Sequence, residues 1–436
     1  MHSRDSNSYD SIPIPSWKPR RNLTLDLGLR WEAQIEPSPL TPPSQVFFGP
    51  FIGKTVTSAK GTFAFPSDGT IPSDWKMFQP RLGAAWDVNA DASEVIRASA
   101  GVYYARVPAI EVASSRTTNG SIGQRLTRSS AGSLTSGAPA AYPSLLPAPS
   151  GVPTRPDVIV FDRNFQNPRT IGLSLGYERL LTTDLVASVG VIHNRTDFLE
   201  RVVNRNDAVF GSPWSTGLGA GGTNGVGQIT TVESSARSRY TGFTIGARGR
   251  PTSRLELHAD YTLSYDRSDD DNERDLFTFR YARADSLNNE YAWSDRDQRH
   301  RLVGWLRWRA PYDLAISNVV RVSSAQPMSE KCGTGSVGTG VRAAVLADRL
   351  CPDGHILPRN TLRRENAFFS WDLRFSREFV LGDGGRIEPT IEFLNLTNAD
   401  NYLDPAATAL LFNFDGTVRS GLGDPRQVQA GLRWRF

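Results

Sequence analysis

The sequence of 436 residues predicts an all-β fold, an antiparallel transmembrane β-barrel of about 12 strands with long extracellular loops. Three observations support this prediction. Apolar and polar residues alternate with a period of two in about 12 segments, which gives each strand one apolar and one polar face. Short and long connections between these segments also alternate, and aromatic residues occur at the segment ends.

The carboxyl-terminal segment, 426–436, shows the alternation most clearly. Val428, Leu432 and Trp434 fall on one parity, whereas glutamines and arginines fall on the other. A strand of roughly 9–11 residues that separates lipid from water needs this pattern at this length. A soluble sheet with one buried face would show the same pattern once, so the prediction depends on its repetition.

The pattern recurs from the amino end onward. In 22–32 every second residue is leucine or tryptophan, with polar or small residues between them. The segment 314–322 is weaker, and its parity is not assignable. The other predicted strands are 81–88, 95–104, 169–178, 185–191, 243–248, 255–266, 302–308, 369–376 and 387–393.

The predicted strands are joined by two kinds of connection. The short ones are 89–93, 181–184, 251–253, 310–312 and 382–385, and the long ones are 34–78, 105–167, 196–237, 267–296, 324–366 and 398–425. Consecutive antiparallel strands place alternate turns on opposite rims, and outer-membrane barrels keep the short turns periplasmic. We therefore expect Phe436 at the periplasmic rim. Trp86, Trp308 and Trp434 fall at the same rim, as interfacial aromatic residues do.

Composition argues against a nucleic-acid-binding protein and a helical membrane protein, and the amino-terminal sequence bears on where the chain begins. The net charge is +4 with arginines spread along the strands, which gives no nucleic-acid footprint, and no run of about 18 apolar residues predicts a helical span. Residues 1–21 read as an irregular segment without the apolar core of a signal peptide. Because an outer-membrane protein needs such a peptide, we expect the chain to begin inside a longer protein, with the barrel portion at 22–436.

Five short motifs follow one another along the chain: 22–32 (NLTLDLGLRWE), 165–170 (FQNPRT), 297–302 (DQRHRL), 392–398 (EFLNLTN) and 424–429 (DPRQVQ). In sequence and order they resemble the barrel of Oar-like TonB-dependent receptors. The resemblance spans nearly the whole chain and implies location in the bacterial outer membrane. The signal peptide, the carboxypeptidase-regulatory-like domain, the TonB-contacting segment and the plug of that family are not recognised in this sequence.

The resemblance implies a barrel of about 22 strands, of which this sequence holds the carboxyl-terminal portion. It implies TonB-dependent uptake or export of a ligand bound by the extracellular loops, with the TonB complex contacted only through the missing plug. The implied partners also include outer-membrane lipid, lipopolysaccharide and the barrel-assembly machinery, for which Trp434 and Phe436 form the carboxyl-terminal insertion signal. The alternative is a passive porin, an adhesin or a surface scaffold without energy coupling.

For the structure of this chain we expect a curved, incomplete barrel wall. Its edge strands, 22–32 and 426–436, are expected to be unpaired or forced together, since closure depends on the tilt and stagger of the strands. A closed, well-paired small barrel would contradict the expectation of a larger barrel.

Two motifs resemble enzyme signatures. Gly172-Leu-Ser-Leu-Gly176 matches the serine-hydrolase elbow, but a hydrolase needs Ser174 on a sharp strand-to-helix turn beside a histidine and an acid. Here the strand pattern continues through Glu178. Gly217–Gly222 fits a dinucleotide fingerprint, yet no strand pattern precedes it, which indicates a flexible loop. A soluble all-β hydrolase is the third alternative, and our prediction is no enzyme activity, no catalytic residue and no cofactor.

Acidic residues offer only weak metal candidates. Glu256, His258 and Asp260 share one strand face, but alternate side chains of a strand lie about 7 Å apart, which favours a polar stripe over a compact site. The acidic loop 266–273 lacks EF-hand spacing, which favours a solvated loop. Its weak candidates for Ca²⁺ or for cations that bridge to lipopolysaccharide are Asp269, Asp270 and Asp271.

Both cysteines, Cys332 and Cys351, lie in one predicted extracellular loop. Passage through an oxidising periplasm favours a disulfide, which would contribute about 3 kcal/mol by the loop-entropy relation. The stretch 341–350 between them predicts a small helix. A zinc site with His355 is the weaker hypothesis, because a fourth ligand is not apparent.

Overall fold

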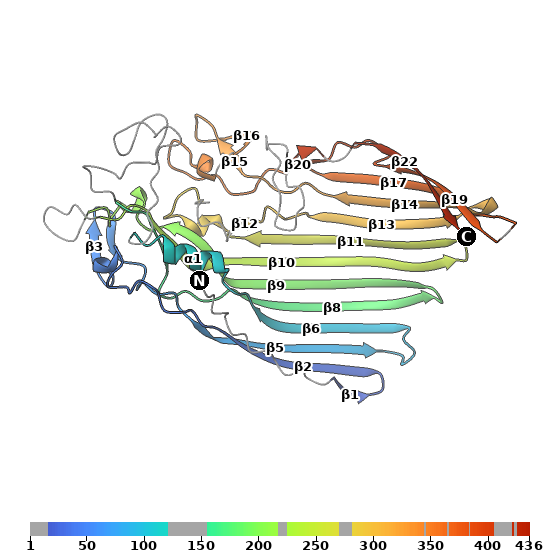
Figure 1. The fold of residues 1–436 in the computed structure, drawn as a ribbon, viewed down its shortest axis with the longest axis horizontal. Helices are drawn as coiled ribbons and strands as arrows, with labels where there is room; N and C mark the ends of the chain where they lie inside the picture. The colour runs from blue at the N-terminus through green and yellow to red at the C-terminus, as the bar shows by residue number, and fades with distance from the viewer. Residues whose placement is uncertain are drawn as a thin grey trace.

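The computed structural model describes residues 16–120, 155–216, 225–269, 281–343, 346–363, 366–382, 384–404, 421–422 and 425–436. Its main feature is one sheet of 16 strands (Figure 1), whose long strands lie side by side in chain order. None of the helices in the described part of the chain has the length and apolarity needed to span a bilayer.

Twelve long strands form the wall, and each pairs antiparallel with the next. They are β2 (Leu23–Gln34), β5 (Asp74–Asp87), β6 (Glu94–Tyr104), β8 (Arg169–Thr182), β9 (Leu185–Asn204), β10 (Ile229–Thr252), β11 (Leu255–Ser268), β13 (His300–Arg309), β14 (Leu314–Ser323), β17 (Phe368–Arg377), β19 (Arg386–Leu394) and β22 (Gln427–Arg435). Every predicted strand is confirmed. The main difference is length, because β9 and β10 extend well beyond the predicted segments into the loop layer.

Shorter strands, loop hairpins and helical turns accompany the twelve long strands. Four more strands belong to the main sheet: β1 (Trp17–Arg20), β7 (Val158–Phe161), β12 (Ala292–Trp293) and β18 (Phe379–Val380). Loop hairpins are β3 (Thr55–Ser58) with β4 (Gly61–Ala64), β15 (Glu330–Cys332) with β16 (Gly338–Arg342), and β20 (Tyr402–Asp404) with β21 (Gly421–Leu422). Helical turns are α1 (Ala109–Thr117), η1 (Gly49–Phe51), η2 (Ala208–Phe210), η3 (Leu287–Glu290), η4 (Pro311–Asp313) and η5 (Leu346–Arg349).

Two local predictions need correction. The segment 1–21 was expected to be irregular, but Trp17–Arg20 pairs with β2 as β1. The helix expected over 341–350 is wrong as well, because β16 runs to Arg342 and, among the described residues that follow, Leu346–Arg349 form the short turn η5. The reason is tertiary: the side chain of Arg349 is fully buried in contact with a neighbouring loop, and such contacts override helix propensity.

The sheet is open at both edges. In the part of the chain that the structure describes, β1 pairs only with the first residues of β2, and β22 pairs only with β19. Among the described residues no ladder joins β22 to β1 or β2. The expected incomplete wall is therefore confirmed. The short turns all lie at one end of the strands and the long loops at the other (Figure 1), so Phe436 lies at the short-turn, periplasmic end.

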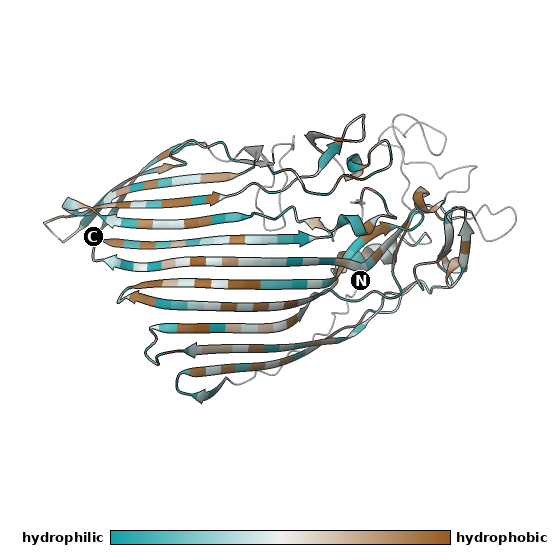
Figure 2. Cartoon of the chain, turned by 180° about the vertical axis from the view of Figure 1, so that it is seen from behind, coloured by the Kyte–Doolittle hydropathy of each residue, from teal (hydrophilic) through white to brown (hydrophobic). Residues whose placement is uncertain are grey.

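Side chains on the two faces of the wall differ as the alternation predicts. Brown and teal bands alternate along the strands in Figure 2. Leucines of the outward parity are not packed into a core, since Leu173 is 48% and Leu432 is 70% exposed. In the described part of the chain both buried apolar clusters belong to the loop layer and the adjoining strand ends. The wall therefore has an apolar outer surface, as lipid contact requires.

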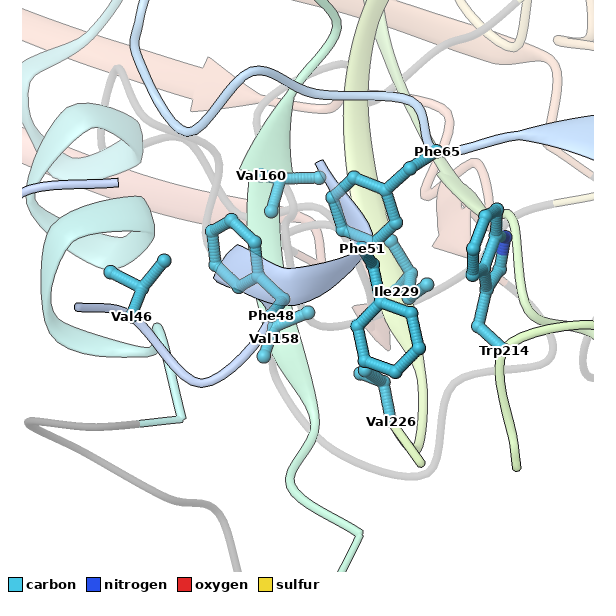
Figure 3. Close-up of a cluster of buried hydrophobic side chains, with 9 residues drawn as sticks. All are labelled: Val46, Phe48, Phe51, Phe65, Val158, Val160, Trp214, Val226 and Ile229. Atoms are coloured by element: carbon cyan, nitrogen blue, oxygen red, sulfur yellow. The ribbon is translucent and has the colours of Figure 1, made fainter. Parts of the chain in front are cut away.

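The larger buried cluster shows how the loops fold onto one another. Phe48, Phe51 and Phe65 come from the first long loop, and Trp214 comes from the loop between β9 and β10 (Figure 3). The ring centroids of Phe65 and Trp214 lie 5.3 Å apart in an edge arrangement. β7 adds a parallel partner to β10 at the base of the cluster. The loop layer is thus a packed body with its own core.

Candidate functional site

The inner face of the wall carries the polar half of the alternation. Glu178 on β8 lies 3.2 Å from the guanidinium of Arg248 on β10 and 3.9 Å from that of Arg97 on β6. Arg374 on β17 and Glu392 on β19 pair at 3.2 Å. These groups stay largely accessible, so each pair contributes little to stability. The inner face is an accessible, polar lining of mixed charge.

A basic patch lies on the inner face at the short-turn end of the strands. Arg250, Arg254, Arg307 and Arg309 surround an open cavity of about 140 Å³. The carboxylate within the patch is that of Glu256, which accepts a hydrogen bond from Arg250 at 3.4 Å. Positive charge therefore exceeds negative charge at this end of the inner face.

The polar stripe on β11 does not form a metal site. His258 lies 2.5 Å from Asp260 and stacks on the ring of Trp305, whereas Glu256 turns toward Arg250. The ligand atoms of the three candidates therefore do not converge, in agreement with the interpretation as a polar stripe.

The ring of Tyr103 lies beside Gly172 of the apparent hydrolase motif and beside Gly101 on β6. A Cβ at Gly172 would lie 3.4 Å from the ring of Tyr103, and one at Gly101 would lie 2.7 Å from its hydroxyl oxygen. Arg81 covers the same ring at 4.9 Å from its centroid. Ser174 lies in the middle of β8, with its hydroxyl 2.7 Å from that of Ser99. No strand-to-helix turn is formed here, so the elbow interpretation fails. Gly217–Gly222 lies outside the described residues.

Asp297 of the DQRHRL motif holds two loops at the extracellular end of β13. Its carboxylate is fully buried and pairs with Arg363 and, at 3.3 Å, with Arg299. The backbone N–H of Asp266 donates to it at 2.7 Å. The motif is therefore a junction between the loop after β11 and the loop before β17, a role that its sequence did not reveal.

The FQNPRT motif has a similar role at the start of β8. The buried side chain of Asn167 donates to the carbonyl of Ala105 at 3.0 Å and to Gln34 at 2.7 Å. Its backbone N–H donates to Asp74 at 3.3 Å. One residue thus connects the upper ends of β2, β5, β6 and β8.

A second pair of loops is joined by a buried ion pair. Glu290 of η3 and Arg349 of η5 are both fully buried, and Nη2 of Arg349 lies 2.7 Å and 2.6 Å from the two carboxylate oxygens. Nη1 of the same arginine donates to the carbonyl of Leu357 at 2.9 Å. No sequence pattern indicated this pairing, because the partners are 59 positions apart in irregular segments.

A cavity of about 260 Å³ opens on the loop layer between the β3–β4 hairpin and the upper ends of β9 and β10. Its aromatic walls include Phe63, Phe65, Phe210 and Trp214. Glu233 and Arg205, which also line it, are joined by two hydrogen bonds. Aromatic walls beside a fixed charged pair are typical of sites for small organic ligands, although this cavity is smaller than the usual range of about 300–1,000 Å³.

Of the acidic-loop candidates, only Asp269 lies in the described part. Its carboxylate lies 3.7 Å from the guanidinium of Arg201 and 3.5 Å from that of Arg237. Burial raises the pKa of Asp269, and the two arginines offset part of that effect. Asp270 and Asp271 lie outside the described residues.

The two cysteines are joined in the structure, with the sulfur atoms of Cys332 and Cys351 2.02 Å apart. Ligand atoms of Cys351, Asp353 and His355 lie within 4.8 Å of one another, but a disulfide sulfur is not the thiolate that zinc requires. Hydrogen bonds from Ser336 and His355 lower the pKa of Asp353 to about 2. The geometry gives these three residues no metal-binding role.

Comparison with known proteins finds a similar architecture among outer-membrane proteins. Residues 15–320 match a family model described as "Outer membrane beta barrel domain". No curated protein matches the sequence. Among solved structures, the outer membrane transporter YddB from Escherichia coli is similar, with a TM-score of 0.53 at 10% identity over 94% of this chain and 43% of that chain.

Two further structures are the siderophore receptor PiuA from Acinetobacter baumannii and the iron transporter FrpB from Neisseria meningitidis. PiuA has a TM-score of 0.49 at 10% identity, over 96% of this chain and 42% of that chain. FrpB has a TM-score of 0.46 at 14% identity, over 94% and 43%. The chain thus spans less than half the length of these structures. At such low identity the likeness concerns the fold alone.

Proposed function

The chain belongs to the outer membrane beta barrel family, and from this premise we propose that it forms part of the wall of an Oar-like, TonB-dependent receptor. In this proposal the loop layer binds a scarce or large ligand, which crosses the outer membrane along the polar inner face. A plug and the TonB complex would gate and energise the passage.

The observation that carries the proposal is the open wall with an accessible, polar lining. Unpaired backbone groups at a sheet edge are too costly to expose to lipid, so the edges at β2 and β22 need further strands of a larger barrel. A large barrel leaves a lumen that a plug can fill, whereas a small barrel is filled by its own side chains. The basic patch around Arg250 and Arg307 supplies a charged surface for a partner inside the lumen.

The loop layer supports ligand recognition. Its apolar clusters and buried junctions hold the loops in fixed positions, and the cavity lined by Phe63 and Trp214 lies within it. Fixed loops lose less entropy on binding than mobile ones. We propose further that Trp434 and Phe436 serve as the insertion signal read by the barrel-assembly machinery, since both are exposed on the edge strand.

Uptake measurements in the bacterium that carries this gene test the proposal. Deletion of the gene should abolish uptake of at least one member of a panel of scarce nutrients, and collapse of the proton-motive force should abolish the same uptake. Uptake that depends on the gene but survives collapse of the force would favour a passive porin. A deletion that changes no uptake would favour an adhesin or a scaffold.

We also propose that Cys332 and Cys351 are oxidised in the native protein. The disulfide closes a loop with a sequence separation of 19, which contributes about 3 kcal/mol by the loop-entropy relation. Replacing both cysteines with serine should speed proteolysis within 324–363 and leave the wall intact. Alkylation without reductant should add no mass to the native protein, and two modified cysteines would contradict the proposal.

A further inference from the structure

A histidine and a carboxylate lie in line behind one sulfur atom of the loop disulfide. Nε2 of His355 lies 3.4 Å from Sγ of Cys351, and Nδ1 of the same ring lies 2.8 Å from a carboxylate oxygen of Asp353. In this order of sulfur, imidazole and carboxylate, a histidine activates a cysteine and a third group orients the histidine. Here the arrangement occurs beside a disulfide instead of a free thiol.

A tight turn holds the ring in this position. The backbone N–H of Cys351 donates to the carbonyl of His355 at 2.8 Å, and that of Gly354 donates to the carbonyl of Cys351 at 2.9 Å. Gly354 has a φ of +87°, a conformation that favours glycine. Asp353 also accepts a hydrogen bond from the backbone N–H of His355 at 3.1 Å. The turn 351–355 therefore fixes the imidazole and the carboxylate relative to Sγ of Cys351.

The surroundings of Cys351 favour negative charge on its sulfur. Hydrogen bonds from Ser336 and His355 lower the pKa of Asp353 to about 2, so this carboxylate is charged at neutral pH. A charged carboxylate stabilises a positive imidazole, as in a catalytic triad. A positive imidazole in contact with a sulfur atom stabilises the thiolate. Cys351 is therefore prepared to leave as a thiolate when the disulfide breaks.

The other sulfur atom lies among carbonyl oxygens. Sγ of Cys332 is 3.5 Å from the carbonyl oxygen of Gly335 and 3.7 Å from that of Val337. The partial negative charge of these oxygens disfavours a thiolate at Cys332. In thiol–disulfide exchange the sulfur that carries negative charge more readily leaves faster. The difference between the two sulfur atoms makes Cys332 the one that is attacked.

An open hollow of about 800 Å³ gives solutes access to the disulfide. Both cysteines line it, together with Lys331, Thr334 and Asp348. Cys332 and Cys351 are only 8% and 3% exposed. Exchange requires direct access of the attacking sulfur, so the hollow suits a small thiol better than a thiol on a protein surface.

We propose that the disulfide is an exchange site for low-molecular-weight thiols, with Cys332 as the attacked sulfur, Cys351 as the leaving group and His355 as its proton donor. The inference rests on the oxidised state of the two cysteines within the proposed function, and it is independent of transport. The site would couple the covalent closure of this loop to the supply of thiols outside the cell.

The exchange step forms one bond and breaks one. The thiolate of the small thiol attacks Sγ of Cys332 and forms a mixed disulfide, while the bond to Cys351 breaks and its electron pair goes to Sγ of Cys351. Nε2 of the protonated His355 delivers a proton to that sulfur. The ring then takes up from solvent the proton that the small thiol lost on ionisation. One thiol is consumed for each thiol formed, so the step needs no further oxidant or reductant.

The test treats the full-length protein in detergent briefly with β-mercaptoethanol, a neutral thiol that is not steered by charge, and then traps free thiols with iodoacetamide. Peptide mass spectrometry should find the mixed disulfide on Cys332 and the alkyl group on Cys351. His355→Gln should slow the exchange about tenfold, less than the hundred-fold of an enclosed proton donor because the ring is 43% exposed. The variant should also divide the mixed disulfide more evenly between the two sulfur atoms, which a merely structural role of His355 does not predict.

Two further variants separate the imidazole from its surroundings. Asp353→Asn should slow the exchange less than His355→Gln does, because it removes the charge behind the ring but leaves the ring beside Cys351. Lys331→Gln is the matched control, since it removes a charged group from the same hollow and leaves the line of sulfur, imidazole and carboxylate intact. Its exchange rate should equal that of the wild-type protein.

The position of the mixed disulfide in the wild-type protein tests the inference without any variant. A mixed disulfide mainly on Cys351, no exchange at all, or equal rates in His355→Gln and the wild-type protein would overturn the site. Two alkylated cysteines before any thiol is added would overturn both the site and the proposed oxidised state. None of these results depends on nutrient uptake, so failure of the transport proposal remains distinguishable.

Discussion

Replacing Glu290 with glutamine should release the disulfide-bearing loop from its neighbour and lower the free energy that keeps it docked by about 3–5 kcal/mol. The side chains of Glu290 and Arg349 are both fully buried and doubly hydrogen-bonded. Replacing the carboxylate with an amide leaves the guanidinium buried without a counter-charge, held only by neutral acceptors such as the carbonyl of Leu357. An uncompensated buried charge is far more costly than the loss of an exposed pair.

Hydrogen exchange of the lipid-embedded protein measures this effect. Amides in 281–299 and 346–363 should exchange at least a hundred-fold faster in the variant, whereas those in β8 and β9 should not change. The matched control is Asp285→Asn, which breaks the accessible 2.6 Å pair with Arg283 in the same loop and should have little effect. Restoration of slow exchange by the double replacement Glu290→Leu, Arg349→Met would support the charge argument. Equal exchange in Glu290→Gln and Asp285→Asn would contradict it.

Introducing arginine at Leu175 should destabilise the wall by about 2–4 kcal/mol, the cost of a cation on the lipid face near the middle of the bilayer. Leu175 is 52% exposed, and its direct partners on that face are Ala98 and Val191. None of these neighbours offers a counter-charge. The adjacent residue, Ser174, points to the inner face, where its hydroxyl meets that of Ser99.

Urea unfolding of the full-length protein in lipid vesicles, followed by tryptophan fluorescence, compares Leu175→Arg with Ser174→Arg. The two variants add the same side chain to the same strand one residue apart. The lipid-face variant should lose stability, whereas the inner-face variant should stay within about 0.5 kcal/mol of the native protein. A greater loss for Ser174→Arg would reverse the assignment of the faces.

The sequence was sufficient to predict the long strands of the wall, because the alternation of apolar and polar residues is a local property of each strand. Two-residue alternation needs only the neighbouring residues, so β22 was placed to within one residue at each end, whereas β8 runs four residues beyond its predicted end at 178. The order of short and long connections then gave the polarity of the barrel. The open edges also followed, since 12 long strands are fewer than the resemblance to a larger barrel requires.

The loop layer depended on contacts that a single sequence does not reveal. The buried pair of Glu290 and Arg349, the parallel strand β7 and the cluster around Trp214 all join distant segments. The expected helix at 341–350 failed because burial of Arg349 outweighed local propensity. The motif residues Asp297 and Asn167 stood out from the sequence only through the resemblance, and their role as loop junctions required coordinates.

The central claim is that one face of this sheet contacts lipid and the other contacts water. Single cysteines placed in turn at positions 171–178 of β8, each carrying a fluorescent label in the bilayer-embedded protein, test it most directly. Labels at 171, 173, 175 and 177 should be quenched by a lipid-borne quencher, and labels at 172, 174, 176 and 178 by a water-soluble one. Quenching without a two-residue period, or with the two sets exchanged, would contradict the account.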